Sequence, residues 1–328
     1  MMTTRTRFAA LSAMLVLAVS YFASPGFAAD YPTKPVRMIV TFPPGGGMDT
    51  MARLISGPLG ERLKQSVVVD NRPGASGLIG AEAAARSAPD GYTLLMGSAD
   101  THAINPAVFS NIRYDAIKDF APVALLGDLP MTLVVNSNVT ANNIEEFLRI
   151  VKERPGKMTY SSWGIGSGSQ IAMEMILQPT GLQMLHVPFP GSAPAIAAVM
   201  GGQVDAMMVT LPTSESNHAS GRVRILGVTP IRRPAGAPDF PRAGMPPDVG
   251  IWVGVFAPAK TDPAIVAQLN REIKSLMDDA TVRASFAKTG LEVVPSVSPP
   301  ADFARFVETS HAAWGKTVRA ANIKVELK

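Results

Sequence analysis

The sequence predicts an α/β protein built from two domains with a ligand cleft between them. Apolar, β-branched runs alternate with helical patterns through most of the chain, which is typical of βαβ units around a largely parallel sheet. This alternation restarts after Asn136, and a length of 328 residues also favours about two domains over one. A glycine-rich connection follows one strand in each half. Two such loops, one per domain, predict the cleft.

The N-terminal residues have the pattern of a secretory signal peptide. Arg5 and Arg7 precede an apolar run at 8–19, and Gly26 and Ala28 supply the small residues expected at a cleavage site after Ala28. A membrane anchor is the alternative, but the run is well short of the ~20 residues that cross a bilayer. We therefore expect a soluble, exported protein.

The remaining elements follow from hydrophobic periodicity and turn residues. Asp262 before Pro263 is expected to cap the first of three C-terminal helices. Residues 230–250 are rich in Pro and Gly, which is typical of an irregular connection. Strands are expected at 36–42, 67–69, 93–96, 132–135, 158–161, 185–187, 204–209, 224–228 and 252–256, and helices at 50–64, 81–87, 144–153, 169–177, 193–200, 263–277, 280–289 and 300–318.

Composition excludes several classes of function. Removing the signal peptide takes away two of the 30 Lys and Arg residues and none of the 26 Asp and Glu residues, which leaves 28 against 26 and a net charge of +2. The sequence has no Lys- and Arg-rich stripe of the kind that binds nucleic acid, so nucleic acid is not an expected partner. It has no cysteine, which excludes disulfides, thiolate metal sites and a cysteine nucleophile.

The stretch 42–50 places three consecutive glycines between a strand and a helix. This arrangement leaves main-chain N–H groups pointing outward at a helix N-terminus, where the helix dipole favours an anion. Asp49 or Thr50 can cap the helix. A tight turn without a ligand is the alternative. The Gly-Lys-Ser/Thr order of a phosphate-binding Walker loop and the G-x-G-x-x-G spacing of a dinucleotide fingerprint are both missing here.

A second loop of the same character occupies residues 161–170. It joins a strand to a helix and offers small residues, hydroxyls and free N–H groups. It also misses the dinucleotide spacing, because position 169 is serine, and no acidic residue follows about 20 residues on, where a ribose contact belongs. Two anion-binding loops facing each other are therefore expected.

A set of short motifs occurs in a fixed order along nearly the whole mature chain. It comprises YPTKPVR at 31–37, FPPGGGMD at 42–49, NRPGASG at 71–77, DGYTLL at 90–95, HVPF at 186–189, GGQVD at 201–205, WVGVFAP at 252–258 and WGK at 314–316. In this order the motifs resemble those of the Bug-type solute receptors of tripartite tricarboxylate transporters.

The resemblance implies a bilobed periplasmic-binding-protein (Venus flytrap) fold and a function without catalysis. Such a receptor closes on a small carboxylate and delivers it to the membrane subunits of its transporter. The implied protein is periplasmic and monomeric and needs no cofactor and no metal. The expected division is a signal peptide at 1–28, a discontinuous first domain at 29–134 plus 253–328, and a second domain at 135–252.

The resemblance also implies the ligand contacts, which would be backbone N–H groups, hydroxyls and ordered waters rather than a salt bridge. Carried over by position, they fall on the first loop, on Ser76, on Ser98 with its neighbours, on the second loop, and on a strand end near 209. The candidate residues are Phe42, Pro44, Gly45, Gly46, Gly47, Met48, Asp49, Thr50, Ser76, Ser98, Ser162, Trp163, Gly164, Gly166, Ser167, Ser169, Val209 and Thr210.

The chain departs from the family pattern at several of these positions. Trp163, Ile165, Gln170, the pair 209–210 and Met48 mostly replace polar residues by apolar ones. A carboxylate with an apolar or aromatic body would suit that change, because Trp163 could stack on a ring. Plain packing is the alternative role for this tryptophan. The lack of an acidic residue near 209 weakens the case for an amino-acid ligand.

Two other functions are weighed against the receptor. A secreted hydrolase would need a G-x-S-x-G elbow or an H-E-x-x-H helix, and neither occurs; Ser76 in GASG has the wrong spacing. A receptor that docks on a signalling partner instead of a transporter has the same sequence features. The hydrolase is therefore a remote alternative, while the signalling receptor stays open.

Overall fold

The computed structural model describes residues 31–229, 250–288, 292–294 and 297–320. The expected signal peptide and nearly all of the expected connection at 230–250 lie outside the described residues. Residues 34–328 form one compact unit. Among the residues that the structure describes, no helix is both long and apolar enough to cross a bilayer.

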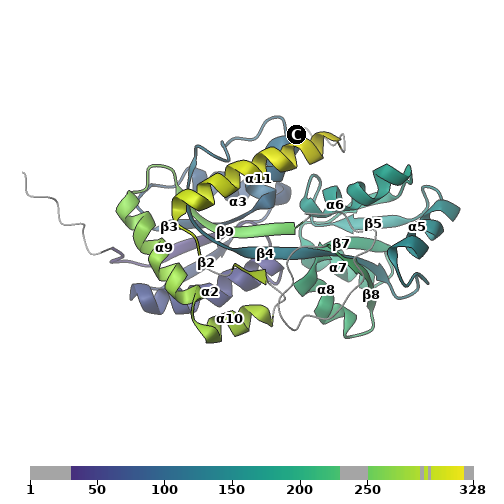
Figure 1. The fold of residues 1–328 in the computed structure, drawn as a ribbon, viewed down its shortest axis with the longest axis horizontal. Coiled ribbons are helices and arrows are strands. Elements are labelled where there is room, and N and C mark those ends of the chain that lie inside the picture. The colour runs from purple at the N-terminus through teal and green to yellow at the C-terminus, as the bar shows by residue number, and fades with distance from the viewer. Residues whose placement is uncertain (1–30, 230–249, 289–291, 295–296, 321–328) are drawn as a thin grey trace, which may run out of the picture. The chain divides into compact units, whose positions relative to one another are not determined.

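The core of this unit is a mixed sheet (Figure 1). The strands described in it are β1 (Val36–Val40), β2 (Val67–Asn71), β3 (Thr93–Ser98), β4 (Phe120–Asn136), β5 (Thr159–Ser162), β6 (Leu185–Pro188), β7 (Ala206–Thr210), β8 (Val223–Val228), β9 (Gly250–Pro258) and β10 (Glu292–Val293). Their order is β2-β1-β3-β9-β4-β7-β5-β6, and β8 and β10 both pair with β4.

The long strand β4 connects the two halves of the sheet. It pairs with β9 from Phe120 to Pro130 and then with β7 and β8 from Met131 to Asn136. We call the part around β1, β2, β3 and β9 the first half, and the part around β5, β6, β7 and β8 the second half. The partners of β4 thus change between residues 130 and 131, four residues before the expected domain boundary at 134/135, which stays a prediction.

The expectation of a largely parallel sheet is wrong. The pairs β1–β2, β1–β3, β5–β6 and β5–β7 are parallel, whereas β3–β9 and every described pair of β4 are antiparallel. The sequence predicted only residues 132–135 of β4, because Pro122, Gly127 and Pro130 interrupt its apolar pattern. Register shifts near Pro122 and Gly127 absorb these residues, since bulges are where strands tolerate proline and glycine.

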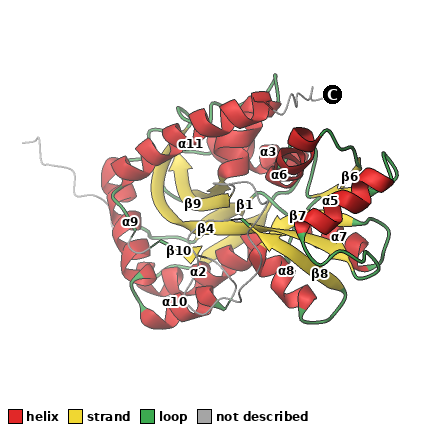
Figure 2. Cartoon of the chain, turned by 45° about the vertical axis from the view of Figure 1, so that its right-hand side comes forward, coloured by secondary structure: helices red, strands yellow, loops and turns green. Residues whose placement is uncertain are grey.

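Helices flank the strands on both faces (Figure 2). They are α2 (Gly47–Leu63), α3 (Leu78–Ala85), α4 (Asn105–Val108), α5 (Ile144–Glu153), α6 (Gly168–Leu177), α7 (Ser192–Met200), α8 (Leu211–His218), α9 (Pro263–Met277), α10 (Ala280–Ala287) and α11 (Pro300–Ala320), with the short turns η1 (Ala75–Gly77), η2 (Asp100–Ile104) and η3 (Gln178–Thr180). The expected cap at Asp262 is confirmed, because its side chain accepts a hydrogen bond from the Ala264 N–H.

Four of these helices follow a strand of the sheet, either directly or after a short loop. α2 follows β1, α6 follows β5, α7 follows β6 and α8 follows β7. Because β5, β6 and β7 are parallel neighbours, α6, α7 and α8 start at one edge of the second half. Ligands of open α/β sheets bind outside this edge, at the carboxyl ends of the strands.

An aromatic cluster fixes the turn η2 against the first half. The buried His102 ring stacks on Phe256, with centroids 3.9 Å apart and the planes 12° apart. Burial lowers the pKa of His102 to about 3, so the ring is neutral. The Nδ1 atom of His311, on α11, lies 2.8 Å from the carbonyl oxygen of His102. This packing holds Asp100, the first residue of η2, in place.

Candidate ligand-binding site

A narrow chamber of about 30 Å³ lies between the two halves of the sheet. The first half contributes the start of α2 and Asp100, the second half contributes Trp163 and two helix starts, and β4 and β9 close the chamber. The residues that line this central chamber are Phe42, Gly46, Gly47, Met48, Asp100, Leu129, Trp163, Ser192, Thr210 and Ile251.

Two larger pockets flank the chamber and share lining residues with it. One, of about 380 Å³, shares Gly47 and Leu129 with the chamber and is otherwise lined chiefly by α7 and α8; we call it the aliphatic pocket. The other, of about 470 Å³, shares Phe42 and Trp163 with the chamber; we call it the aromatic pocket. Its further lining includes Phe109, Phe189 and the prolines 43, 188 and 190. The chamber itself has room for about two water molecules, so most of a ligand's body would extend into a flanking pocket.

The N-termini of four helices converge on the central chamber. Gly46 caps α2, Ser192 begins α7 and Thr210 caps α8, and all three residues line the chamber. The fourth helix, α6, donates the N–H of its first residue, Gly168, to the Asp100 carboxylate. The first-turn N–H groups of a helix lack intrahelical acceptors and carry the positive end of the dipole. None of the residues that line the chamber or its flanking pockets is Lys or Arg.

The glycines of the first loop permit a close approach of the two halves. A Cβ atom at Gly46 would lie 3.1 Å from the Ser192 Oγ, and one at Gly47 would lie 3.7 Å from the Thr210 Oγ1. Gly45 has φ +81°, a conformation that favours glycine. Among the described residues, no acceptor bonds the N–H groups of Gly46, Gly47 or Met48. The bare backbone therefore leaves three donors at the chamber.

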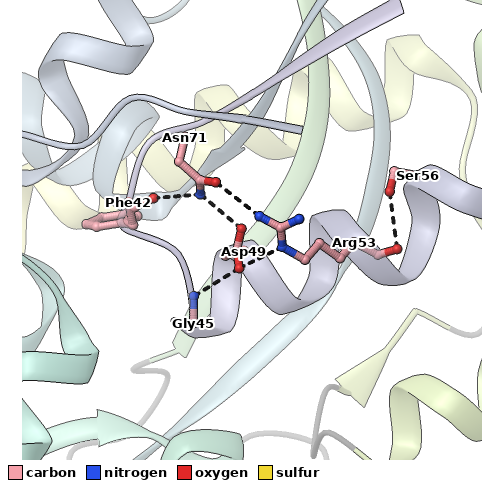
Figure 3. A network of polar contacts seen from close by, with 6 residues as sticks. All are labelled: Phe42, Gly45, Asp49, Arg53, Ser56 and Asn71. Carbon is pink, nitrogen blue, oxygen red and sulfur yellow. Dashed lines mark hydrogen bonds and ion pairs between the residues drawn. The ribbon is translucent and has the colours of Figure 1, made fainter. Parts of the chain in front are cut away.

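Asp49 stabilises the first loop through hydrogen bonds. It does not cap α2, which is the role that the sequence had predicted for Asp49 or Thr50. The N-cap is Gly46, and Asp49 lies in the first turn of α2. Its carboxylate accepts hydrogen bonds from the Gly45 N–H at 2.9 Å, the Arg53 Nε at 3.0 Å and the Asn71 Nδ2 at 3.0 Å (Figure 3). The Asn71 amide also donates to the Phe42 carbonyl oxygen at 3.0 Å. The Gly45 N–H is thus already bonded within the protein.

This network predicts an acid-sensitive contribution to stability. Burial alone would raise the pKa of Asp49, but the hydrogen bonds from Arg53, Gly45 and Asn71 outweigh it and lower this pKa. A lowered carboxyl pKa stabilises the fold above the unfolded value of about 3.9 and loses that effect as pH falls through the folded value. We expect Asp49→Asn to lower the free energy of unfolding at pH 7 by about 1.5–3 kcal/mol, measured by urea denaturation.

The difference between Asp49→Asn and the wild type should shrink below about pH 4, where the unfolded carboxyl takes up a proton before the folded one does. Asp278→Asn is the matched control, because its partner Lys274 is exposed and surface pairs contribute roughly 0–1 kcal/mol. A difference that stays constant from pH 7 to pH 3 would contradict the role given to the ionised carboxylate.

The second loop makes many of its hydrogen bonds internally, so several of the N–H groups that were expected to be free are already bonded. The N–H of Gly164 donates to the Ser162 Oγ, that of Gly166 to the Gln170 Oε1, and that of Gln170 to the Ser167 Oγ. The hydroxyls are also bonded, that of Ser162 to His186 Nε2 at 2.7 Å and that of Ser169 to the Met208 carbonyl oxygen. The side-chain hydroxyls of the loop are therefore largely bonded within the protein.

The structure gathers ten of the eighteen predicted contacts around the chamber and its flanking pockets. They are Phe42, Gly45, Gly46, Gly47, Met48, Thr50, Ser76, Trp163, Gly164 and Thr210. The other eight line none of these pockets: Pro44, Asp49, Ser98, Ser162, Gly166, Ser167, Ser169 and Val209. Ser76 also joins the halves, because its hydroxyl donates to the Ile165 carbonyl oxygen at 2.7 Å.

Sequence reasoning missed four residues of the central chamber: Asp100, Leu129, Ser192 and Ile251. Asp100 and Ser192 each stand just beyond a strand end, Asp100 after β3 and Ser192 after β6. That position is the signal that could have found them, since strand ends face the ligand in α/β sheets. Leu129 and Ile251 lie on β4 and β9 and carry no such signal.

Comparison with known proteins places the chain in a family. Residues 51–323 match the model of the tripartite tricarboxylate transporter family receptor, TctC. The chain belongs to this family. It is 34% identical to Protein BugT of Bordetella pertussis over 317 residues, which cover 95% of this chain and 97% of BugT. The resemblance that the motifs suggested is therefore confirmed.

Similar solved structures confirm the fold class. The structure of R. palustris Rpa4515 with adipate has a TM-score of 0.85 and 32% identity, covering 90% of this chain and all of that one. MatC (Rpa3494) from Rhodopseudomonas palustris with bound malate has a TM-score of 0.81 and 31% identity, covering 88% and 100%. The fold is the bilobed one of periplasmic solute-binding proteins. As a TctC-family member the chain is a solute-binding receptor of a tripartite transporter and not an enzyme.

Proposed function

We infer that the chain captures a small carboxylate in the central chamber and delivers it to the membrane subunits of its transporter. The observation that carries this proposal is the convergence of four helix N-termini on a chamber whose lining contains no Lys or Arg. Fixed N–H dipoles of this kind stabilise an anion without a salt bridge. Two relatives more than 30% identical were solved with adipate and with malate, which supports a carboxylate as the ligand here.

We assign the ligand contacts to the ten predicted residues that line the three pockets, together with Ser192. The carboxylate would accept hydrogen bonds from the backbone of Gly46, Gly47 and Met48, which no described residue occupies. The body of the ligand would lie in the aromatic pocket against Phe42 and Trp163. An apolar or aromatic body fits that lining best.

The domain division at 134/135 and 252/253, cleavage after Ala28, a periplasmic location and a monomeric state complete the proposal. Separation of the two lobes about β4 and β9 would admit the ligand, and closure would bring the second loop onto it. The intact mass of the exported protein checks the cleavage site, because a mass that begins at Ala29 is expected. Light scattering of the same sample checks the monomer.

A thermal-shift screen of residues 29–328 tests the function. The probes are aliphatic, hydroxy, amino and aromatic mono- and dicarboxylates, each with its neutral amide as a matched control. A ligand that binds only the native state adds about RT ln(1 + [L]/Kd) to its stability, so at least one carboxylate should raise the melting temperature with concentration while its amide does not. Equal shifts from acid and amide, or no shift from any carboxylate, would contradict the proposal.

A further inference from the structure

The central chamber contains a carboxylate of its own. Asp100 lines the chamber although it is only 1% exposed. Its Oδ1 atom accepts hydrogen bonds from the Gly168 N–H at 2.7 Å and from the Trp163 Nε1 at 3.4 Å. Its Oδ2 atom has no hydrogen-bond partner among the described residues. A chamber built from anion-binding helix ends thus already holds one acidic side chain.

Asp100 occupies one of the four helix N-termini. Gly168 is the first residue of α6, so this carboxylate takes the position that an external anion would occupy at that helix. Only the starts of α2, α7 and α8 are left for a ligand. The site therefore has the dipoles for one ligand carboxylate, next to a fixed negative group.

Nothing else in the lining balances Asp100. The chamber has no Lys, Arg or His among its lining residues, and no ion pair to Asp100 occurs within the described chain. A second carboxylate on the ligand would stand beside a like charge in a buried space, which is costly. A hydroxyl or ammonium group would instead give Oδ2 the donor that it lacks.

We propose that Asp100 makes the chamber selective for monocarboxylates that also carry a hydrogen-bond donor, a hydroxyl or ammonium group, and that it excludes dicarboxylates. This inference rests on the proposed function, because it assumes that the ligand's carboxylate binds at the helix starts. It also supplies the acidic partner that an amino-acid ligand needs, from η2 instead of from the strand end near residue 209.

The protonation of Asp100 offers a second way to test its charge. Burial raises the pKa of Asp100 to about 6, against the opposing hydrogen bonds from Gly168 and Trp163. The carboxylate is therefore charged at pH 7.5 and largely neutral at pH 5, so the exclusion of a dicarboxylate should relax as pH falls. Other titratable groups close to η2 are His102, Tyr114 and His311, so a variant without the carboxyl is needed as reference.

Calorimetric titration of the wild type, Asp100→Asn and Asp100→Ser tests the proposal. The probes are two matched sets: butyrate, 4-hydroxybutyrate, 4-aminobutyrate and succinate, and benzoate, 4-hydroxybenzoate and terephthalate. At pH 7.5 the wild type should bind a donor-bearing monocarboxylate about tenfold tighter than the dicarboxylate of its set. Both variants should reverse that order, with dicarboxylate affinity rising about tenfold.

Lowering the pH to 5 should raise the succinate affinity of the wild type relative to Asp100→Asn. The protonation of succinate itself affects both proteins alike, so the ratio isolates Asp100. Asp100→Asn is the reference protein for this comparison of the two pH values. Asp100→Ser replaces it as reference if the Asn variant does not fold. Two results would overturn this inference alone. In the first, a dicarboxylate binds the wild type at pH 7.5 as tightly as its hydroxy analogue does. In the second, a dicarboxylate binds the wild type and both variants with equal affinity. Failure of every probe to bind any of the proteins overturns the proposed function and this inference with it.

Discussion

A Gly46→Leu variant is expected to lose roughly 100-fold in affinity for every carboxylate that the wild type binds, which corresponds to about 2.7 kcal/mol. A Cβ atom at this position would already lie 3.1 Å from the Ser192 Oγ on the opposite wall. The rest of a leucine side chain would fill the chamber and cover the N–H groups at the start of α2. Calorimetric titration with the carboxylate that gives the largest thermal shift measures the loss.

The same substitution should keep the backbone conformation and cost only about 1–3 kcal/mol of stability, from overpacking the chamber. Gly46 has φ −83° and ψ 170°, which any residue adopts. The matched control is Gly57→Leu, because Gly57 is exposed in the middle of α2 and a Cβ there would meet no atom within 4 Å. Gly57→Leu should keep the wild-type affinity, and no gain in stability is expected, because Gly57 precedes Pro58 in the helix and a Cβ before proline crowds its ring. Unchanged affinity in Gly46→Leu would show that the chamber is not the binding site.

Trp163→Ala is expected to have the second large effect, on both stability and selectivity. The side chain is 6% exposed and lies between the chamber and the aromatic pocket. Truncating a buried tryptophan costs about 3–5 kcal/mol, so denaturant unfolding should detect a large loss. Aromatic carboxylates should lose far more affinity than aliphatic ones, because the ring they would stack on is gone.

Trp163→Phe separates the ring from its N–H group. It keeps an aromatic face but removes the donor that contacts Asp100, so aromatic selectivity should survive in this variant. It also provides a folded protein if the alanine variant is too unstable to purify. Equal affinity losses for aromatic and aliphatic ligands in Trp163→Ala would contradict the assignment of the ligand body to the aromatic pocket.

Local signals were sufficient to place most helices and strands. α5 and α9 were predicted with their observed ends, because their apolar periodicity is regular and α9 starts at a capping Asp262 with proline in the first turn. α8 was missed because its sequence, LPTSESNH, combines residues of weak helix propensity without an apolar stripe. Its start is set by the end of β7 rather than by a pattern of its own.

Features that depend on contacts between the halves of the sheet could not be predicted from local patterns. The first eleven residues of β4 form a strand only because β9 pairs with them from more than 100 residues away. The glycine loop was recognisable because its chemistry is local, with donors supplied by its own backbone. Asp100 gains its role from Gly168 and Trp163, more than 60 residues further along, so its place just beyond a strand end could be read from the sequence but its partners could not.

The most direct test of the central claim is a crystal structure of residues 29–328 with the carboxylate that gives the largest thermal shift. The account predicts that the ligand's carboxylate oxygens lie about 2.7–3.2 Å from backbone nitrogens at the start of α2 and from Ser192, with no Lys or Arg side chain in contact. A ligand seated outside the central chamber and its flanking pockets, or one held chiefly by Arg or Lys, would contradict it.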